Sequence, residues 1–333
     1  MVGAVLVVGH GQVIGEGHHR AAGSAHAETE ALERAGAAAR GATLYVTLEP
    51  CVHHGRTPPC TDRVIASGIS RVVAAMRDPD PRVDGRGVAA LRAAGIAVEE
   101  NVLAAEAERL NEGFSTRVRL GRPFVLLKLA MTLDGRVALS GRRYLAGAPA
   151  LRFVHRSRAR MDAVLVGVGT VLADDPELTV RLVRGRDPLR VILDTNARTP
   201  ASSHVVSGPD PARTIIVVAD DADPARTDAL CARGVSIVRL PRGADGHVDL
   251  AAALGCLAAR GVNSVLVEGG PGVATALLRD RLVDRLLTIQ TPLVGGSGPR
   301  AFGELGPVQT AGRVTVRRLG DDIAISADLG PAS

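Results

Sequence analysis

His26-Ala-Glu28, Pro50-Cys51 and Cys60 decide how the first part of the chain folds. His26-Ala-Glu28 opens the first clear helical pattern, Pro50-Cys51 follows a predicted strand, and Cys60 begins another predicted helix. One imidazole and two thiolates form a tripodal zinc site whose fourth position is left for water. Bound zinc lowers the pKa of such a water toward neutrality, which favours hydrolytic deamination. Glu28 stands where the zinc-deaminase signature places the carboxylate that carries protons.

The same residues allow other interpretations. A structural zinc site needs four protein ligands, and His53 or His54 could supply the fourth. Alternatively, the cysteines are buried core residues and the histidine lies on the surface. Eight residues separate the two cysteines, whereas the signature has two between them. Residues two apart on a regular helix point apart, so His26 and Glu28 converge only if His26 lies at the helix N-terminus.

Short apolar runs alternate with Ala-rich helical patterns along the whole chain, which predicts an α/β fold. In the first part we expect a hairpin at 4–8 and 12–17, strands at 42–48, 72–75 and 96–98, and helices at 27–39, 60–67, 87–94 and 103–118. Gly and Pro in Leu120-Gly-Arg-Pro123 mark a junction, so we expect domains at 1–121 and 122–333. Later strands are predicted at 124–129, 163–166, 189–193, 214–218, 264–267, 286–290, 314–318 and 322–326.

Composition excludes several classes of protein. Hydrophobic residues make up 46% and charged residues 23%, so the chain is not predominantly disordered. The net charge of +5 is small, and there is no Trp, with only two Tyr and four Phe; a nucleic-acid binder that stacks bases is therefore not expected. No apolar run approaches the ~18 residues of a membrane span, and the N-terminus lacks a signal-peptide pattern. Four cysteines are too few for a disulfide framework, which favours the cytoplasm.

The second part carries glycine-rich turns after predicted strands. Gly167-Val-Gly-Thr170 follows one strand, and Glu268-Gly-Gly-Pro-Gly272 follows another and opens a helix. Free backbone N–H groups at such turns favour phosphate, and open α/β sheets bind ligands at these strand ends. Neither turn is the dinucleotide fingerprint in its first-strand context, and each alone is equally consistent with a purely structural turn.

Lys128 is the only lysine of the chain and lies in an apolar predicted strand. Burial would lower its pKa and allow it to donate a proton to a ribose oxygen or to an imine. In the alternative, only the stem is buried and the ammonium reaches the surface. Cys231 and Cys256 are expected to be small core residues, and His155 to have a surface or packing role.

Taken together, the motifs resemble the bifunctional riboflavin-biosynthesis deaminase–reductase family. The resemblance is carried by Gly15-Glu-Gly-His-His19, by His26-Ala-Glu28, by the run from Ala42 to Cys60 and by the motifs of the second part. It implies a zinc-dependent cytidine-deaminase-like domain followed by a dihydrofolate-reductase-like domain. The first would deaminate a diaminopyrimidinone ribosylamine 5-phosphate, and the second would reduce its ribosyl group to ribityl with NADPH.

The resemblance also implies roles for individual residues. His26, Cys51 and Cys60 would bind one Zn²⁺, and Glu28 would shuttle protons. The implied NADPH contacts are Ala130, Thr170, Asp174, Gly270, Pro271, Gly272, Val273, Ala274, Thr275 and Ala276, and Thr195 is a candidate for the 2′-phosphate. The implied substrate contacts are His19, Arg158, Leu178, Arg181 and Glu268; a guanidinium suits a ribose 5-phosphate. In this chain, however, each arginine is equally consistent with a solvated surface charge. Related enzymes associate through the reductase domain, so a homo-oligomer is expected.

Two departures from the family pattern concern the first domain. Family members have a helix and a Pro-Asn-Pro turn before the equivalent of Val2-Gly3, whereas this sequence starts at Met1. Either the start is placed too late or deaminase function has been lost; the retained zinc set favours the first explanation. In Asp78-Pro-Asp-Pro81, Asp80 replaces the usual Asn. The alternative functions are a chain in which only the reductase is active and a protein that binds zinc or nucleotide without turnover.

Overall fold

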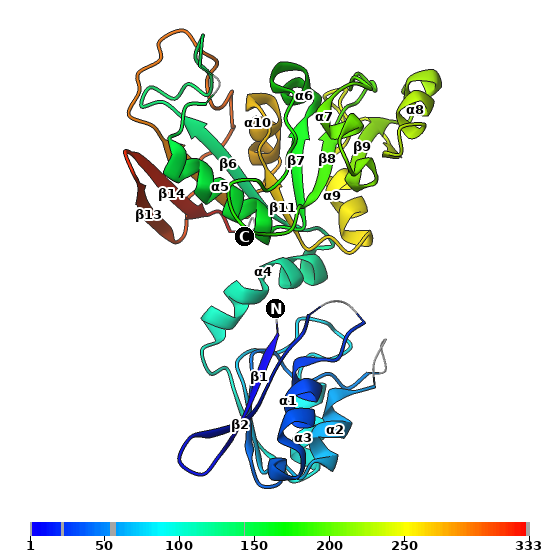
Figure 1. Cartoon of the computed structure of the whole chain (residues 1–333), viewed down its shortest axis with the longest axis vertical. Helices are drawn as coiled ribbons and strands as arrows, with labels where there is room; N and C mark the ends of the chain where they lie inside the picture. The colour runs from blue at the N-terminus through cyan, green and yellow to red at the C-terminus, as the bar shows by residue number, and fades with distance from the viewer. Residues whose placement is uncertain (1, 21–22, 54–57, 143, 331–333) are drawn as a thin grey trace. The chain divides into compact units, whose positions relative to one another are not determined.

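The computed structural model describes residues 2–20, 23–53, 58–142 and 144–330 (Figure 1). The chain forms two compact units, residues 1–120 and 121–333. In the described residues, no helix is both long and apolar enough to cross a membrane.

The first unit contains a five-stranded sheet in the order β2-β1-β3-β4-β5. The predicted hairpin is confirmed, because β1 and β2 pair antiparallel. β3 pairs antiparallel with β1 and parallel with β4, and β4 pairs parallel with β5. The strands are β1 (Gly3–Val8), β2 (Gln12–His18), β3 (Thr43–Val46), β4 (Arg71–Ala74) and β5 (Ala97–Glu100).

The helices of this unit are α1 (Ala27–Ala35), η1 (Gly36–Ala39), α2 (Cys60–Ala66), α3 (Arg86–Ala93) and α4 (Ala104–Leu120). The single helix predicted for 27–39 ends as an α-helix at Ala35, because Gly36 adopts φ +54°. Leu6 and Leu44 from the sheet pack with Ala31 of α1 and Val64 of α2 in one hydrophobic core. A smaller cluster joins α4 to the residues that follow β3 and β4.

The second unit contains a nine-stranded sheet in the order β10-β9-β8-β7-β11-β6-β12-β14-β13. The first seven strands in this order, from β10 through β12, pair parallel with their neighbours. Strand β14 pairs antiparallel with β12 and with β13. The bounds are β6 (Phe124–Met131), β7 (Ala163–Gly167), β8 (Leu189–Leu193), β9 (Thr214–Ala219), β10 (Ser236–Leu240), β11 (Ser264–Val267), β12 (Arg285–Gln290), β13 (Val314–Leu319) and β14 (Asp322–Asp328).

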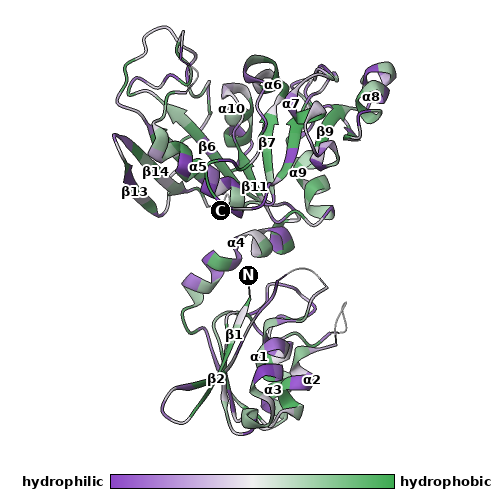
Figure 2. Cartoon of the chain, viewed as in Figure 1, coloured by the Kyte–Doolittle hydropathy of each residue, from purple (hydrophilic) through white to green (hydrophobic). Residues whose placement is uncertain are grey.

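Helices cover both faces of this sheet. The alternation of β6 places Val125, Leu127 and Leu129 in one core, and Phe124 and Leu126 in the other. Figure 2 shows the central strands β6, β7 and β8 as largely hydrophobic, as expected for parallel strands buried on both faces. The helices are α5 (Ala148–Arg160), α6 (Val168–Asp174), α7 (His204–Ser207), η2 (Pro211–Arg213), α8 (Pro224–Cys231), α9 (Leu250–Ala259) and α10 (Pro271–Arg279).

Helix α1 packs directly on β2, and this contact requires glycine at position 17. A Cβ atom on Gly17 would lie 2.1 Å from the carbonyl oxygen of Ala27. Neither backbone can yield without moving α1, whose first turn follows His26. The close approach therefore fixes the start of α1 against the sheet.

We expect Gly17→Ala to lower the free energy of unfolding of the first unit by about 1–3 kcal/mol, because the added methyl group overpacks a backbone contact. Gly3→Ala is the matched control, since a Cβ at Gly3 meets only the carbonyl oxygen of Gly17, at 3.9 Å. Urea unfolding followed by hydrogen exchange of α1 peptides measures the effect. Equal stability of the two variants would contradict this account.

Candidate functional sites

Three potential metal ligands converge in the first unit. His26 is the N-cap residue of α1 and has an extended backbone, Cys51 lies in the loop after β3, and Cys60 is the first residue of α2. The Nδ1 atom of His26 is 3.1 Å from Sγ of Cys60 and 3.6 Å from Sγ of Cys51. All three ligand atoms lie within 4.8 Å of one another.

This donor set fits zinc. In a tetrahedral zinc site with ordinary bond lengths, a nitrogen and a sulfur ligand lie about 3.6 Å apart, close to the two distances in this chain. Among the described residues, the group that could hold a metal consists of His26, Cys51 and Cys60 and does not include His53. His54, the other candidate for a fourth ligand, lies outside the described residues. The described ligands are thus one nitrogen and two sulfur atoms.

Glu28 lies beside these ligands. His26 and Glu28 can converge only if His26 lies at the N-terminus of the helix, and it does. His26 precedes the first turn of α1, and Glu28 lies within that turn. The Glu28 side chain is almost fully buried and lies close to the side chain of Cys60. Burial raises the pKa of Glu28 above its ordinary value. A carboxyl group with a raised pKa next to a metal site is suited to accept and return protons.

The loop that carries Cys51 is held by backbone hydrogen bonds. Thr61 donates from both its backbone N–H and its hydroxyl to the carbonyl oxygen of Cys51, and the N–H of Cys60 donates to the Cys51 sulfur. The start of α2 therefore fixes one ligand relative to the other. The ring of His19 lies edge-on to His26, with 5.2 Å between the ring centroids, which places this predicted substrate residue at the same site.

Glu49 is a buried residue of this region that the sequence did not single out. Its carboxylate accepts hydrogen bonds from the backbone N–H groups of Asp78, Gly85 and Val88, at 2.9–3.2 Å. It thereby joins the loop before Cys51 to the loop before α3. Its partners are backbone groups distant in the sequence, so no residue pattern identifies them.

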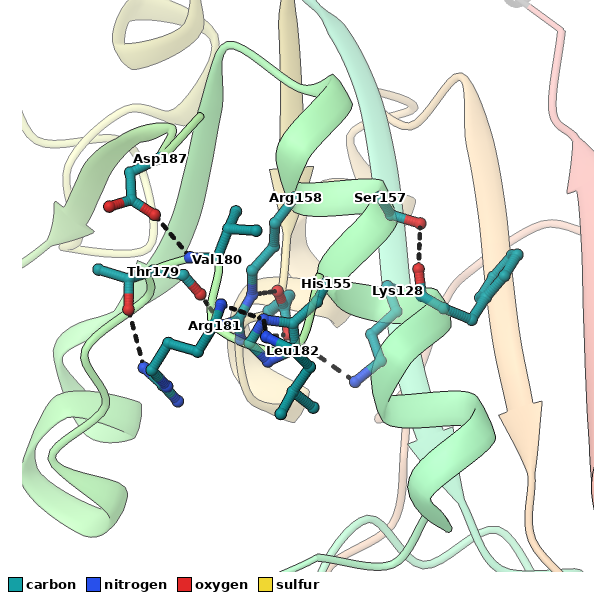
Figure 3. Close-up of polar contacts among 11 residues, drawn as sticks. Lys128, His155, Ser157, Arg158, Thr179, Val180, Arg181, Leu182 and Asp187 are labelled. Atoms are coloured by element: carbon teal, nitrogen blue, oxygen red, sulfur yellow. Dashed lines mark hydrogen bonds and ion pairs between the residues drawn. The ribbon is translucent and has the colours of Figure 1, made fainter. Parts of the chain in front are cut away.

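In the second unit, the strand register brings Lys128 next to Glu268. Leu127 of β6 and Val267 of β11 are paired neighbours, and Lys128 and Glu268 are the next residues of their chains. The ammonium of Lys128 is 3.8 Å from Oε2 of Glu268. Arg158 of α5 donates to both oxygens of the same carboxylate, from Nε at 2.6 Å and from Nη2 at 3.1 Å (Figure 3).

These three charges are largely removed from solvent, and their side chains are 16% (Lys128), 12% (Arg158) and 9% (Glu268) exposed. Burial opposes ionisation of Glu268, but Arg158 and Lys128 outweigh it and lower its pKa to about 2. Burial lowers the pKa of Lys128, against the opposing effect of Glu268. The cluster therefore combines a permanent anion with a lysine that releases its proton more readily than usual.

The segment Leu178–Arg181 runs past this cluster. Leu178 is buried and has φ +56°, and Nη1 of Arg158 donates to the carbonyl oxygen of Thr179. The side chain of Arg181 is 41% exposed and pairs with Glu177. His155 is buried and accepts a hydrogen bond from the N–H of Arg181; of the two roles predicted for it, packing is confirmed and a surface position is wrong.

Most of the predicted cofactor residues gather where β7 and β11 end. Helix α6 begins after Gly167 and α10 begins after Gly270. A Cβ on Gly270 would lie 3.8 Å from the hydroxyl of Thr170, so the two turns adjoin. Residues 270–276 lie at the start of α10, Thr170 lies in the first turn of α6, and Ala130 lies near the end of β6, whereas Asp174 is the last residue of α6.

Thr195 and the two cysteines of the second unit lie apart from this edge. Thr195 follows β8, which is separated from β11 by β7, and its hydroxyl accepts a hydrogen bond from the N–H of Val248. Cys231 is exposed at the end of α8, so the prediction that it is a core residue is wrong, whereas Cys256 packs against the core. The buried residues of α8 are Thr227 and Leu230, and Cys231 is not among them.

Comparisons with known proteins cover both units. The family described as the cytidine and deoxycytidylate deaminase zinc-binding region matches residues 1–76, and the RibD C-terminal domain matches residues 123–325. The riboflavin biosynthesis protein RibD of Escherichia coli (strain K12) is 41% identical over 316 residues, 90% of this chain and 84% of that protein. Its counterpart in Aquifex aeolicus is 42% identical over 97% of this chain and 90% of that protein.

Solved structures agree with these matches. Acinetobacter baumannii RibD, form 1, superposes with a TM-score of 0.87 at 35% identity and covers 100% of this chain and 92% of that one. A Thermotoga maritima diaminohydroxyphosphoribosylaminopyrimidine deaminase/5-amino-6-(5-phosphoribosylamino)uracil reductase gives a TM-score of 0.83 at 37% identity, with 98% and 91% covered.

We expect Cys51→Ala to lose bound zinc, because one imidazole and one thiolate remain where three ligands are needed. His53→Ala is the control and is expected to keep about one zinc per chain. Metal analysis after dialysis measures the stoichiometry. Full zinc in Cys51→Ala, or loss of zinc in His53→Ala, would contradict a site made of His26, Cys51 and Cys60.

Proposed function

The chain belongs to the RibD family of riboflavin biosynthesis proteins, and we propose how its residues divide the family's two reactions between the two units. The enzyme is a bifunctional deaminase and reductase that uses zinc and NADPH. We assign to it the substrates in the name of the Thermotoga relative: a diaminopyrimidine ribosylamine phosphate for the first unit and the resulting uracil for the second. The convergence of His26, Cys51 and Cys60 beside buried Glu28 supports the first assignment most strongly.

In the deaminase, zinc would be held by His26, Cys51 and Cys60 and would supply Lewis-acid activation of the attacking water. Glu28 takes the proton from that water and delivers it to the leaving ammonia, which its burial and its position beside Cys60 favour. His19 lies beside His26 and is proposed to bind the substrate. A fixed start of α1 keeps His26 and Glu28 in the required relation.

We expect Glu28→Gln to lower the rate of ammonia release by about 10²-fold or more, because the amide cannot carry the proton. Zinc content is expected to stay at its original level, since Glu28 is not a ligand. NADPH oxidation with the deaminated substrate serves as the internal control and is expected to be unchanged. Undiminished ammonia release would remove Glu28 from the mechanism.

In the reductase, NADPH would bind at the turns that open α6 and α10 and would supply the hydride. Lys128 is proposed to donate a proton at the ribose oxygen or at an imine formed on ring opening. Glu268 holds the ammonium of Lys128 and the guanidinium of Arg158 in place. Because the donors of Arg158 are directed to Glu268 and Thr179, we assign the 5-phosphate chiefly to the more exposed guanidinium of Arg181.

We expect Lys128→Met to lower the rate of NADPH-dependent reduction by about 10²-fold or more, because the variant lacks the lysine proton donor of the cluster. NADPH binding is expected to persist, since the turns at α6 and α10 are unchanged. Stopped-flow NADPH oxidation and equilibrium NADPH titration separate the two effects, and ammonia release reports on the other unit. Turnover equal to that of the original enzyme would exclude Lys128 as the donor.

The same assays address the alternative in which only the reductase is active: NADPH oxidation without ammonia release would support it. We further propose that the enzyme acts in the cytoplasm, because the three ligand atoms include two thiols that must stay reduced. Assembly through the reductase unit and the absence of nucleic-acid partners remain predictions from the sequence.

A further inference from the structure

His155 is a buried side chain of the second unit for which the reduction itself requires no role. It lies on α5 one helical turn before Arg158, and it is 6% exposed. Its Nδ1 atom accepts a hydrogen bond from the backbone N–H of Arg181 at 3.0 Å, and the N–H of Leu182 lies 3.5 Å away. Figure 3 shows His155 and Arg158 reaching from the same helix toward the segment that carries Arg181.

Two successive peptide units of this segment are held by three side chains. Arg158 donates to the carbonyl oxygen of Thr179, Asp187 accepts from the N–H of Val180 at 2.6 Å, and His155 accepts from the N–H of Arg181. The segment follows Leu178, whose positive φ turns the chain. His155 therefore determines the position of the backbone from which the Arg181 side chain extends.

We propose that His155 is a positioning residue that fixes Arg181 and thereby sets the affinity and selectivity of the reductase for the phosphate end of its substrate. The proposal rests on the assignment of Arg181 to the 5-phosphate given under Proposed function. His155 needs no contact with the substrate for this role. It needs a lone pair on Nδ1, which only the neutral imidazole provides.

The surroundings of His155 keep it neutral near pH 7. The charged groups that face it are Arg158 on its own helix, Arg181 on the segment, Lys128 on β6 and Glu268 after β11. Burial lowers the pKa of His155, the three cations reinforce this effect, and Glu268 opposes it. Protonation below the ordinary value of 6.5 replaces the acceptor by a donor that faces the Arg181 N–H. Phosphate recognition is thus expected to weaken as the pH falls.

The test compares two variants of the full-length enzyme. His155→Leu fills similar space without an acceptor, whereas His155→Asn keeps an acceptor that does not titrate. We expect His155→Leu to raise KM for the phosphorylated substrate about tenfold, the effect of one lost hydrogen bond, with kcat and the Kd of NADPH unchanged. His155→Asn is expected to restore KM to within about threefold. KM for the dephosphorylated substrate is expected to be the same in all three proteins.

The pH profile supplies a readout that a merely structural role would not change. Between pH 7.5 and 5.5, KM of the original enzyme is expected to rise more steeply than that of His155→Asn; the substrate phosphate titrates equally in both. Equal profiles would overturn the proposal, even if His155→Leu fails to fold. A KM of His155→Leu equal to that of the original enzyme would overturn it as well.

Arg181→Ala separates this proposal from the function on which it rests. If Arg181→Ala keeps the preference for phosphorylated over dephosphorylated substrate, the assignment of the phosphate to Arg181 is wrong. If Arg181→Ala loses the preference and His155→Leu keeps it, the assignment stands and the role of His155 is wrong. If Arg181 binds the phosphate and His155 acts only by positioning Arg181, the double variant His155→Leu/Arg181→Ala is expected to show the same preference for phosphorylated substrate as Arg181→Ala alone.

Discussion

Both sites depend on one constraint: a strand ends, and a helix begins, at the same edge of a sheet. A helix start exposes backbone N–H groups that lack partners within the helix, and successive crossovers bring such starts together. In the first unit, His26 is the N-cap residue of α1, Cys60 is the first residue of α2, and Cys51 follows β3. In the second unit, α6 and α10 begin after β7 and β11. The two sites therefore occupy similar positions relative to strand ends and helix starts, and they differ in the side chains found there.

The three buried carboxylates of the two units, Glu28, Glu49 and Glu268, have different partners and different roles. Glu49 is satisfied by three backbone N–H groups and stiffens the loops around the ligands. Glu268 instead balances Lys128 and Arg158. Removing one partner from such a buried cluster is strongly destabilising, because it leaves an uncompensated buried charge. Glu268 therefore holds the side chains of Lys128 and Arg158 in place. The pKa of Glu28 is raised by burial, which suits a residue that exchanges protons rather than one that holds a charge.

The sequence identifies what local pattern encodes. Apolar runs predict every strand of the two sheets except β10, which was missed. The histidine–glutamate and cysteine spacing identifies a metal site. Helix α5 was not predicted, because its four arginines leave only Ala150, Val154 and His155 as a narrow buried face. His155 was consequently not associated with Arg181, and the partnership of Arg158 with Glu268 joins residues far apart in the chain. Helix α1 was predicted too long, since the turn at Gly36 resembles a continuing Ala-rich helix.

The central claim is that the first unit holds zinc with one nitrogen and two sulfur atoms of the protein and keeps one coordination position for the reaction. X-ray absorption at the zinc edge of the purified, zinc-loaded enzyme tests it directly. The account predicts one nitrogen, two sulfurs and one additional light atom that is displaced by a competitive inhibitor of the deaminase. A second imidazole in the coordination shell, or a third sulfur, would contradict it.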